Sequence, residues 1–203
     1  SNRKQFVSIG NQSSNHQTIN CGVPQGSVLG PLLFLMYIND MGNSSTKLNF
    51  HLFADDTDLL FANKNLKNLE ITINEELSKV NNWLIANKLT LNLEKSKLVL
   101  FRPPQKKFNH NFIVCLNNKA LELENHVNYL GISIDRHLNW REHVKKTLAK
   151  MSRGIGVLTK IRHYVNTSIL VQLYYFLIYP FLTYGVLAWG NTYITNLQKI
   201  IFS

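Results

Sequence analysis

The sequence predicts an α+β segment followed by an all-helical and strongly basic segment, with the boundary near residue 135. Three observations carry this prediction. Short apolar runs separated by turn residues recur before the boundary, and two of them enclose a pair of adjacent aspartates. A long helix with one apolar stripe interrupts these runs. Beyond the boundary the apolar residues recur at helical spacing, among nine cations and a single acid.

The first 62 residues predict strands and one buried helix. Residues 4–9 and 16–20 predict two short strands around a polar loop, and a loop rich in Gly and Pro follows at 22–27. Residues 31–38 are apolar almost all round, as in a fully buried helix, and Pro31 suits a first helical turn. Residues 48–54 and 57–62 predict two strands that form a hairpin, with Asp55 and Asp56 at its tip.

The clearest predicted helix follows Asn65, which suits an N-cap. Its apolar residues step by three or four positions and are Leu66, Leu69, Ile73, Leu77, Val80 and Leu84. We expect this helix to pack on the hairpin of Asp55 and Asp56. Further strands are predicted at 97–101, 112–116, 120–123 and 127–134, with a hairpin turn at Asn117-Asn118.

Helical spacing returns at Trp140. The predicted apolar face consists of Val144, Leu148, Met151, Ile155 and Leu158. Residues 169–189 are apolar enough to raise a transmembrane interpretation. Gln172 and Pro180 interrupt them, which favours a buried helix broken at Pro180.

Charge is distributed unevenly along the chain, whose net charge is +10. Residues 1–135 hold 13 Lys and Arg and 11 Asp and Glu, whereas residues 136–203 hold nine cations and only Glu142. This asymmetry indicates either a polyanionic partner or a basic surface kept for solubility. Hydrophobic residues make up 45% of the chain, which is enough for a packed core. Two cysteines, Cys21 and Cys115, predict no disulfide framework and a reducing interior.

The sharpest feature is Phe53-Ala54-Asp55-Asp56. Adjacent carboxylates raise each other's pKa unless a cation neutralises them, and Mg²⁺ prefers such hard oxygen ligands. Pairs of metal ions about 3.5–4 Å apart drive in-line phosphoryl transfer in polymerases. Taken alone, these four residues also fit an ordinary acidic turn, because Asp favours turns.

Four ordered segments resemble the reverse transcriptases of non-LTR (LINE-type) retrotransposons. The segments are Gly22-Val-Pro-Gln-Gly-Ser-Val-Leu-Gly-Pro-Leu-Leu-Phe34 with Tyr37-Ile-Asn-Asp40, Phe53-Ala-Asp-Asp-Thr57, Trp83-Leu with Asn87-Lys-Leu and Leu91-Asn-Leu-Glu-Lys-Ser96, and Tyr129-Leu-Gly-Ile132 with Asp135, Leu138 and Trp140. The tail, with Leu173-Tyr-Tyr, Pro180, Tyr184-Gly185 and Trp189-Gly190, also looks like the family's segment beyond the polymerase motifs. The resemblance implies a partial right-hand polymerase palm at 1–135 and a helical thumb with a post-polymerase segment at 136–203.

The resemblance assigns roles to residues of the palm. Asp55 and Asp56 match the catalytic, metal-binding aspartates, and Mg²⁺, or Mn²⁺, is the implied cofactor. Phe53 and Ala54 match positions that face the nucleotide and primer end. Gln25 and Gly26 match the loop that approaches the templating base, where a glycine permits close backbone approach; a helix-entry turn is the alternative.

Two further sites follow from the resemblance. Lys95 matches a lysine near the leaving pyrophosphate, where a cation stabilises developing charge. The alternatives are a solvated surface lysine and an assignment to Lys97. Residues 129–131, Tyr-Leu-Gly, match the hairpin that grips the primer strand, and the alternative is a plain buried strand.

The helical segment fits a thumb that holds a phosphate backbone, with a solvated basic face as the alternative. The candidate contacts are Arg141, Lys145, Lys146, Lys150 and Arg153, with Lys160 and Arg162 nearby. The implied partners are an RNA template, a DNA primer and deoxynucleoside triphosphates, and no membrane.

The chain begins at Ser1 and lacks the family's fingers and first catalytic aspartate, so we expect a piece of a longer protein that is inactive alone. Its function is then that of an RNA-directed DNA polymerase fragment in an intracellular ribonucleoprotein, nuclear or cytoplasmic. The alternative is a degenerate or co-opted remnant that binds nucleic acid without catalysis.

Overall fold

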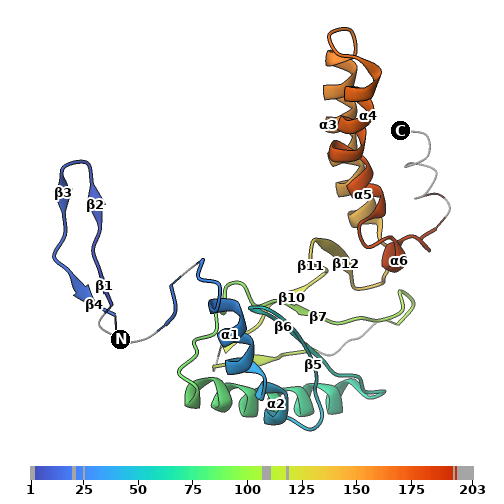
Figure 1. Cartoon of the computed structure of the whole chain (residues 1–203). Coiled ribbons are helices and arrows are strands. Elements are labelled where there is room, and N and C mark those ends of the chain that lie inside the picture. The colour runs from blue at the N-terminus through green and yellow to red at the C-terminus, as the bar shows by residue number, and fades with distance from the viewer. Residues whose placement is uncertain are drawn as a thin grey trace. The chain divides into compact units, whose positions relative to one another are not determined.

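A computed structural model of the chain describes residues 3–19, 22–24, 26–106, 111–117, 119–193 and 195, and these form two compact units (Figure 1). The first unit comprises residues 1–90 with 114–118, and the second comprises 91–113 with 119–203. The units are defined by compactness alone. The division at residue 135 between a palm and a thumb therefore stays a prediction.

The first unit holds strands at its beginning and two helices that follow. Its elements are β1 (Lys4–Gln5), β2 (Ser8–Ile9), β3 (Gln12–Ser13), β4 (Gln17–Thr18), α1 (Gly30–Ile38), the 3-10 helix η1 (Met41–Ser44), β5 (Asn49–Phe53), β6 (Asp56–Leu60), α2 (Leu66–Ala86) and β8 (Cys115–Leu116).

The strands predicted at 4–9 and 16–20 form one antiparallel ribbon with interruptions, in which β1 pairs with β4 and β2 with β3. β3 lies within the segment predicted as a polar loop. The hairpin predicted around the paired aspartates is present. β5 and β6 pair antiparallel in a register that runs from Asn49 opposite Leu60 to Phe53 opposite Asp56. Asp55 and Asp56 therefore lie at the junction of two adjacent strands, as predicted.

Helix α2 spans the predicted stripe, and the side chain of Asn65 caps it by accepting hydrogen bonds from the backbone N–H groups of Lys67 and Asn68. The buried side of α2 packs mainly against η1 and β8. There the Cys115 N–H donates to Asn74 Oδ1 at 2.7 Å. The predicted packing of this helix on the β5–β6 hairpin is therefore not its principal contact. Val114, just before β8, supplies the apolar cover instead and is fully buried.

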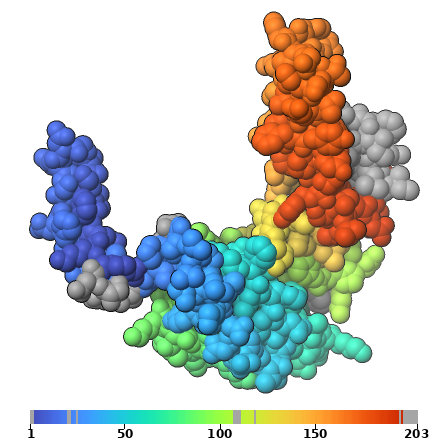
Figure 2. Space-filling view, viewed as in Figure 1, coloured from blue at the N-terminus to red at the C-terminus, as the bar shows by residue number. Residues whose placement is uncertain are grey.

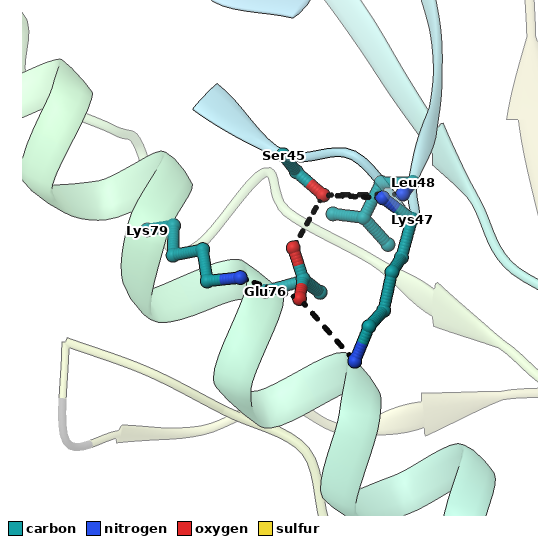
Figure 3. Close-up of polar contacts among 5 residues, drawn as sticks. All are labelled: Ser45, Lys47, Leu48, Glu76 and Lys79. Atoms are coloured by element: carbon teal, nitrogen blue, oxygen red, sulfur yellow. Dashed lines mark hydrogen bonds and ion pairs between the residues drawn. The ribbon is translucent and has the colours of Figure 1, made fainter. Parts of the chain in front are cut away.

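A buried carboxylate on α2 fixes the chain that enters β5 (Figure 3). Glu76 has no exposed surface. It accepts hydrogen bonds from Ser45 Oγ at 2.6 Å and from Lys79 Nζ at 2.7 Å, and Lys47 Nζ lies 3.8 Å away. Ser45 Oγ in turn accepts the N–H of Leu48 at 3.1 Å, one residue before β5 begins. The hydrogen bond from Lys79, followed by that from Ser45, lowers the pKa of Glu76 below its ordinary 4.5.

The prediction that residues 31–38 form a helix is confirmed, but the prediction that it is fully buried is wrong. Only Gly30 and Ile38 of α1 are buried, while Leu32 and Met36 are exposed. Figure 2 shows the surface of α1 uncovered on the near side of its unit. The apolar composition predicts what the helix can bury, and the described residues of this unit cover one edge of it.

The second unit begins with short strands and ends with helices. Its elements are β7 (Leu98–Val99), β9 (Lys119–Ala120), β10 (Leu123–Glu124), β11 (His126–Tyr129), β12 (Ile132–Asp135), α3 (Arg141–Ile161), α4 (Thr167–Leu177), α5 (Tyr179–Thr183) and α6 (Val186–Trp189).

Several strands differ from their predictions. The strand predicted at 112–116 is reduced to β8, and the one predicted at 120–123 is divided between β9 and β10. The strand predicted over 127–134 is a hairpin, because the chain reverses at Leu130-Gly131, where φ is 44° and 82°. Left-handed values at both turn positions suit the twist of a two-residue hairpin. The strand predicted at 97–101 is reduced to β7, which pairs in parallel with β10.

Helices α3 and α4 pack side by side and α5 packs against both (Figure 1). The α3–α4 contact is close at Gly154, where an added Cβ would lie 3.0 Å from Leu177 O and from Ile178 Cγ1. The predicted break near Pro180 is confirmed, since α4 ends at Leu177 and Pro180 lies in the first turn of α5. The predicted burial is wrong, because no residue of α4 is buried. Among the described helices, none combines the length and apolarity needed to cross a membrane.

We predict that Glu76 makes stability depend on acid pH. Its pKa is lower in the folded chain than in the unfolded one, so its contribution is present above about pH 4.5 and is lost as pH falls through the folded-state pKa. Glu76→Gln should lower the melting temperature at neutral pH. It should also reduce the fall of the melting temperature between about pH 5 and about pH 3. Thermal unfolding across this range tests it. Glu75→Gln, an exposed neighbour with the same charge change, is the control. If the melting temperature fell equally at acid pH in the Glu76→Gln variant and in the unsubstituted chain, the prediction would be contradicted.

Candidate functional site

The paired aspartates lie at the tip of the β5–β6 hairpin. Phe53 ends β5 and pairs with Asp56, which begins β6, so Ala54 and Asp55 form the two-residue turn between them. Ala54 has φ of 52°, a left-handed conformation that costs a residue with a Cβ roughly 1–2 kcal/mol. All four residues are exposed. The structure thus brings Phe53, Ala54, Asp55 and Asp56 together on one accessible tip.

The register also places two residues that the sequence reasoning did not assign. Side chains two positions apart project from the same face of a strand, so Asp56 and Asp58 share a face of β6. Asp58 pairs with His51 of β5. The opposite face of the hairpin carries Phe50, Leu52 and Leu59, which are half-buried. The spacing of Asp56 and Asp58 within a predicted strand was the signal that was available for this grouping.

The donor chemistry of the tip fits a divalent cation. Aspartate oxygens are hard ligands of the kind that Mg²⁺ takes, and Asp55 and Asp56 are adjacent and accessible. The described residues nevertheless assemble no group of three or more His, Cys, Asp or Glu side chains suited to holding a metal ion. Asp55 and Asp56 by themselves therefore supply fewer ligands than a complete metal site needs.

The predicted template-loop residues are described only in part. Gln25 lies outside the described residues. Gly26 has φ of 80°, and a Cβ built there would meet nothing within 4 Å. The glycine is thus required by the left-handed backbone of the loop, and the space above it is open.

Lys95 and Lys97 lie in the second unit and differ in their contacts. The Lys95 N–H and the Ser96 N–H both donate to Asn92 O, so Lys95 sits in a tight turn with an exposed side chain. Lys97 Nζ instead donates to Glu124 Oε1 at 2.9 Å, and this bond raises the pKa of Lys97. Lys97 is engaged in tying β7 to β10. Lys95 has no side-chain partner within the described ranges.

The hairpin of Tyr129, Leu130 and Gly131 is held by Tyr184, which lies between α5 and α6. The Tyr184 hydroxyl donates to Leu130 O at 2.5 Å, and its ring lies 3.4 Å from a Cβ position at Gly131. Gly185, with φ of 62°, lets the backbone pass so close to Ile132 that an added Cβ would lie 2.4 Å from its Cδ1. Sequence reasoning noted Tyr184-Gly185 without giving it a role. A tyrosine beside a glycine in an otherwise apolar segment was the available signal.

The predicted backbone-contact cations of α3 have unequal surroundings. Lys146 Nζ donates to Asn128 Oδ1 and Ser133 Oγ, which ties α3 to the β11–β12 hairpin. Lys150 Nζ lies 5.3 Å from the centre of the Phe181 ring. Arg153 Nε donates to Ala149 O of its own helix. Arg141 and Lys145 are exposed, and the described residues provide their side chains with no partner.

A buried histidine completes the packing of α3 on β12. His143 Nδ1 accepts the Ser133 N–H at 3.3 Å, and its ring lies 5.3 Å from that of Trp189 in α6. Burial, and then the nearby charges of Lys150 and Lys146, lower the pKa of His143. It is a neutral core residue at physiological pH.

Comparison with known proteins gives a family match over the first two thirds of the chain. A family model described as "Reverse transcriptase (RNA-dependent DNA polymerase)" matches residues 2–134. This range contains both hairpins and the Asp55-Asp56 tip and ends before α3. No solved structure matches the chain.

Curated relatives extend the similarity through α3 to α6. The RNA-directed DNA polymerase from mobile element jockey of Drosophila melanogaster is 28% identical over 208 residues, which are 96% of this chain and 22% of that protein. The probable RNA-directed DNA polymerase from transposon X-element of the same fly is 26% identical over 92% of this chain and 21% of that protein. The Pol polyprotein from type-1 retrotransposable element R1 2 of Nasonia vitripennis is 26% identical over 69% and 35%. The chain thus spans about a fifth of the length of the first two relatives.

We predict that Gly185→Ala destabilises the chain by about 1–3 kcal/mol, because the variant combines a left-handed backbone with a clash against Ile132. Urea unfolding measures the change in the free energy of unfolding. Gly156→Ala is the matched control, since Gly156 is exposed inside α3 and an added Cβ there meets nothing. It should be neutral or stabilising by about 0.5–1 kcal/mol. A Gly185→Ala variant as stable as the unsubstituted chain would refute the role given to this glycine.

Proposed function

The chain belongs to the reverse transcriptase (RNA-dependent DNA polymerase) family, and on that premise we propose that it supplies the aspartate-bearing part of the palm and the thumb of an RNA-directed DNA polymerase that copies RNA into DNA. The observation that carries the proposal is the Asp55-Asp56 pair at the tip of a paired antiparallel hairpin. A non-catalytic remnant is not favoured, because the residues of this tip and its register are intact.

Asp55 and Asp56 are the residues that hold divalent metal in this proposal, with Mg²⁺ as the ion and Mn²⁺ as a substitute. The metal supplies charge stabilisation to the attacking and leaving oxygens of the phosphoryl transfer. Both carboxylates come from the tip of one hairpin. The remaining ligand, by the family resemblance, is an aspartate upstream of the template loop, in a segment that lies outside this chain.

Other residues position the substrates. Phe53 and Ala54 border the metal-binding tip and are exposed, so they can contact the nucleotide and the primer end. Gly26, together with Gln25 on the strength of its sequence position alone, is assigned to the template side, and the open space above Gly26 leaves room for a base. Lys95 is an exposed cation suited to the leaving pyrophosphate, and the engagement of Lys97 with Glu124 favours Lys95 for this task.

The primer and the duplex are held by the second unit in this proposal. The Tyr129–Gly131 turn, fixed by Tyr184, contacts the primer strand. Arg141, Lys145, Lys146, Lys150 and Arg153 contact the phosphate backbone, a mode of binding that positions a duplex without reading its sequence. The protein acts inside the cell, in a nuclear or cytoplasmic ribonucleoprotein.

We predict that Asp55→Asn and Asp56→Asn each reduce primer extension about 100-fold or more, because they keep side-chain shape and remove the charge that holds the metal. The assay uses a polymerase that joins this chain to upstream fingers and palm, with an RNA template and Mg²⁺ or Mn²⁺. Residues 1–203 alone should give no extension. Asp40→Asn, an exposed aspartate before η1, should leave extension unchanged. Full activity in Asp55→Asn, or robust extension by the isolated chain, would refute the proposed site.

We predict that duplex binding is salt-sensitive and that changing Lys145, Lys146 and Lys150 together to Glu weakens it. Each lost phosphate contact should reduce the slope of log affinity against log salt by about 0.9. Lys145→Gln should change this slope alone, whereas Lys146→Gln should also lower the melting temperature, because its bonds to Asn128 and Ser133 are lost. Anisotropy titrations at several salt concentrations measure the slope, and thermal unfolding measures the melting temperature. Lys67→Gln on α2 is the control for both. A duplex affinity that is unchanged by salt concentration and by all these substitutions would exclude α3 as the binding surface.

A further inference from the structure

Helices α4 and α5 present aromatic side chains to solvent, although the composition of this segment suits a core. No residue of α4 is buried. Tyr175 is 57% exposed, Phe176 76% and Tyr179 43%. Figure 2 shows the surface of these helices uncovered on the side facing the viewer. Contiguous exposed apolar surface of this kind marks a binding site more often than chance packing.

Three of these rings form one group, which we call the tyrosine cluster: Tyr174, Tyr175 and Tyr179. The Tyr175 ring meets the Tyr174 ring at 5.3 Å and the Tyr179 ring at 5.2 Å, both edge to face. The Tyr174 and Tyr179 rings are 6.3 Å apart. Each ring is therefore held in orientation by the other two while part of its surface stays open. Within the described part of the chain, none of the three hydroxyls has a hydrogen-bond partner.

Positive charge is concentrated on α3, the helix against which α4 and α5 pack. Lys150 Nζ lies over the ring of Phe181 in α5, and Arg153 is exposed one turn further along α3. The only acid among residues 136–203 is Glu142, near the start of α3. These helices thus combine exposed aromatic rings with an excess of cations, which favours an anionic partner that also has apolar faces.

We propose that the tyrosine cluster binds single-stranded nucleic acid, with bases stacking on its rings and phosphates against Lys150 and Arg153. Stacking platforms beside a cationic groove are a general means of holding single strands. A duplex offers phosphates but keeps its base faces stacked within the helix, so the cluster selects unpaired strands. A second copy of the chain fits the charge poorly, because it would bring a further basic segment of nine cations and one acid against this one.

This site goes beyond the proposed polymerase function. The duplex contacts proposed above involve phosphates alone, whereas the cluster adds contacts between base faces and the rings of α4 and α5, and Lys150 and Arg153 are common to both. It also lies outside residues 2–134, to which the family model extends. An unpaired template strand entering or leaving the polymerase is a ligand of the required chemistry.

The experiment compares three probes by fluorescence anisotropy: a single-stranded RNA of about 12 nucleotides, an abasic strand with the same number of phosphates, and a blunt duplex. The unsubstituted chain should bind the RNA more tightly than the abasic strand. A Tyr175→Leu, Tyr179→Leu double variant keeps apolar area and removes ring faces, so its RNA affinity should fall about tenfold while its abasic and duplex affinities stay unchanged. The matching double Phe variant should bind as the unsubstituted chain does. Tyr164→Leu, an exposed tyrosine before α4 and outside the cluster, is the control.

Three outcomes would overturn the proposal: RNA affinity unchanged in the double Leu variant, equal affinity for RNA and abasic strand, or RNA affinity lost together with thermal stability in both double variants. Self-association that the double Leu variant retains and a double Ser variant loses would identify an apolar dimer surface instead. Failure of the polymerase proposal is separate, because it shows as extension that survives Asp55→Asn. The proposal of base stacking on the tyrosine cluster is tested by the binding measurements alone.

Discussion

The placement of the Asp55-Asp56 tip depends on the buried carboxylate of Glu76, 20 residues beyond Asp56 in sequence. Glu76 is stable as an anion in the interior because Ser45 and Lys79 hydrogen-bond to it and Lys47 lies close. Ser45 then receives the N–H of Leu48 at the entrance to β5. The chain from α2 to the strand that ends at the aspartates is thereby fixed by charge, while the apolar contacts of α2 go mainly to η1 and β8. An acidic residue inside the fold keeps two others in place at its surface.

In the second unit, a hairpin is likewise held by residues distant in sequence, here those that follow α5. Tyr184 holds the carbonyl of Leu130, Gly185 allows contact with Ile132, and Trp189 covers His143. Lys146 adds a polar tie from α3 to β11 and β12. The hairpin proposed to contact the primer is therefore braced from both the start and the end of the helical segment. Among the cations of α3, Lys146 is thus engaged in structural hydrogen bonds, whereas Arg141 and Lys145 are exposed.

Periodicity predicted the parts of the fold that depend on local sequence. The stripe of α2, the cap at Asn65 and the hairpin around Asp55-Asp56 were all correctly predicted, because spacing and turn residues determine them. The burial of α1 and α4 was predicted wrongly. The apolar composition of a helix shows that it could be buried, but it does not show which other element packs against it. The periodicity missed the reversal at Leu130-Gly131 because apolar residues continue through it, whereas the family resemblance predicted a hairpin at residues 129–131, and β11 and β12 do form one there. Partners such as Asn128 for Lys146 depend on tertiary contacts that spacing does not report.

Both proposed substrate-contacting hairpins turn on a residue that is unfavourable there. Ala54 and Leu130 have φ of 52° and 44°, where Gly or Asn would cost less. Leu130 is compensated, because Tyr184 binds its carbonyl and orients the turn. Ala54 has no such bond within the described residues. The conformational cost of its left-handed backbone, roughly 1–2 kcal/mol, is therefore offset by the β5–β6 pairing and by the Glu76 contacts. Strain at an exposed tip that also carries two like charges is difficult to explain by stability, and it is the arrangement expected where a metal and a nucleotide complete the site.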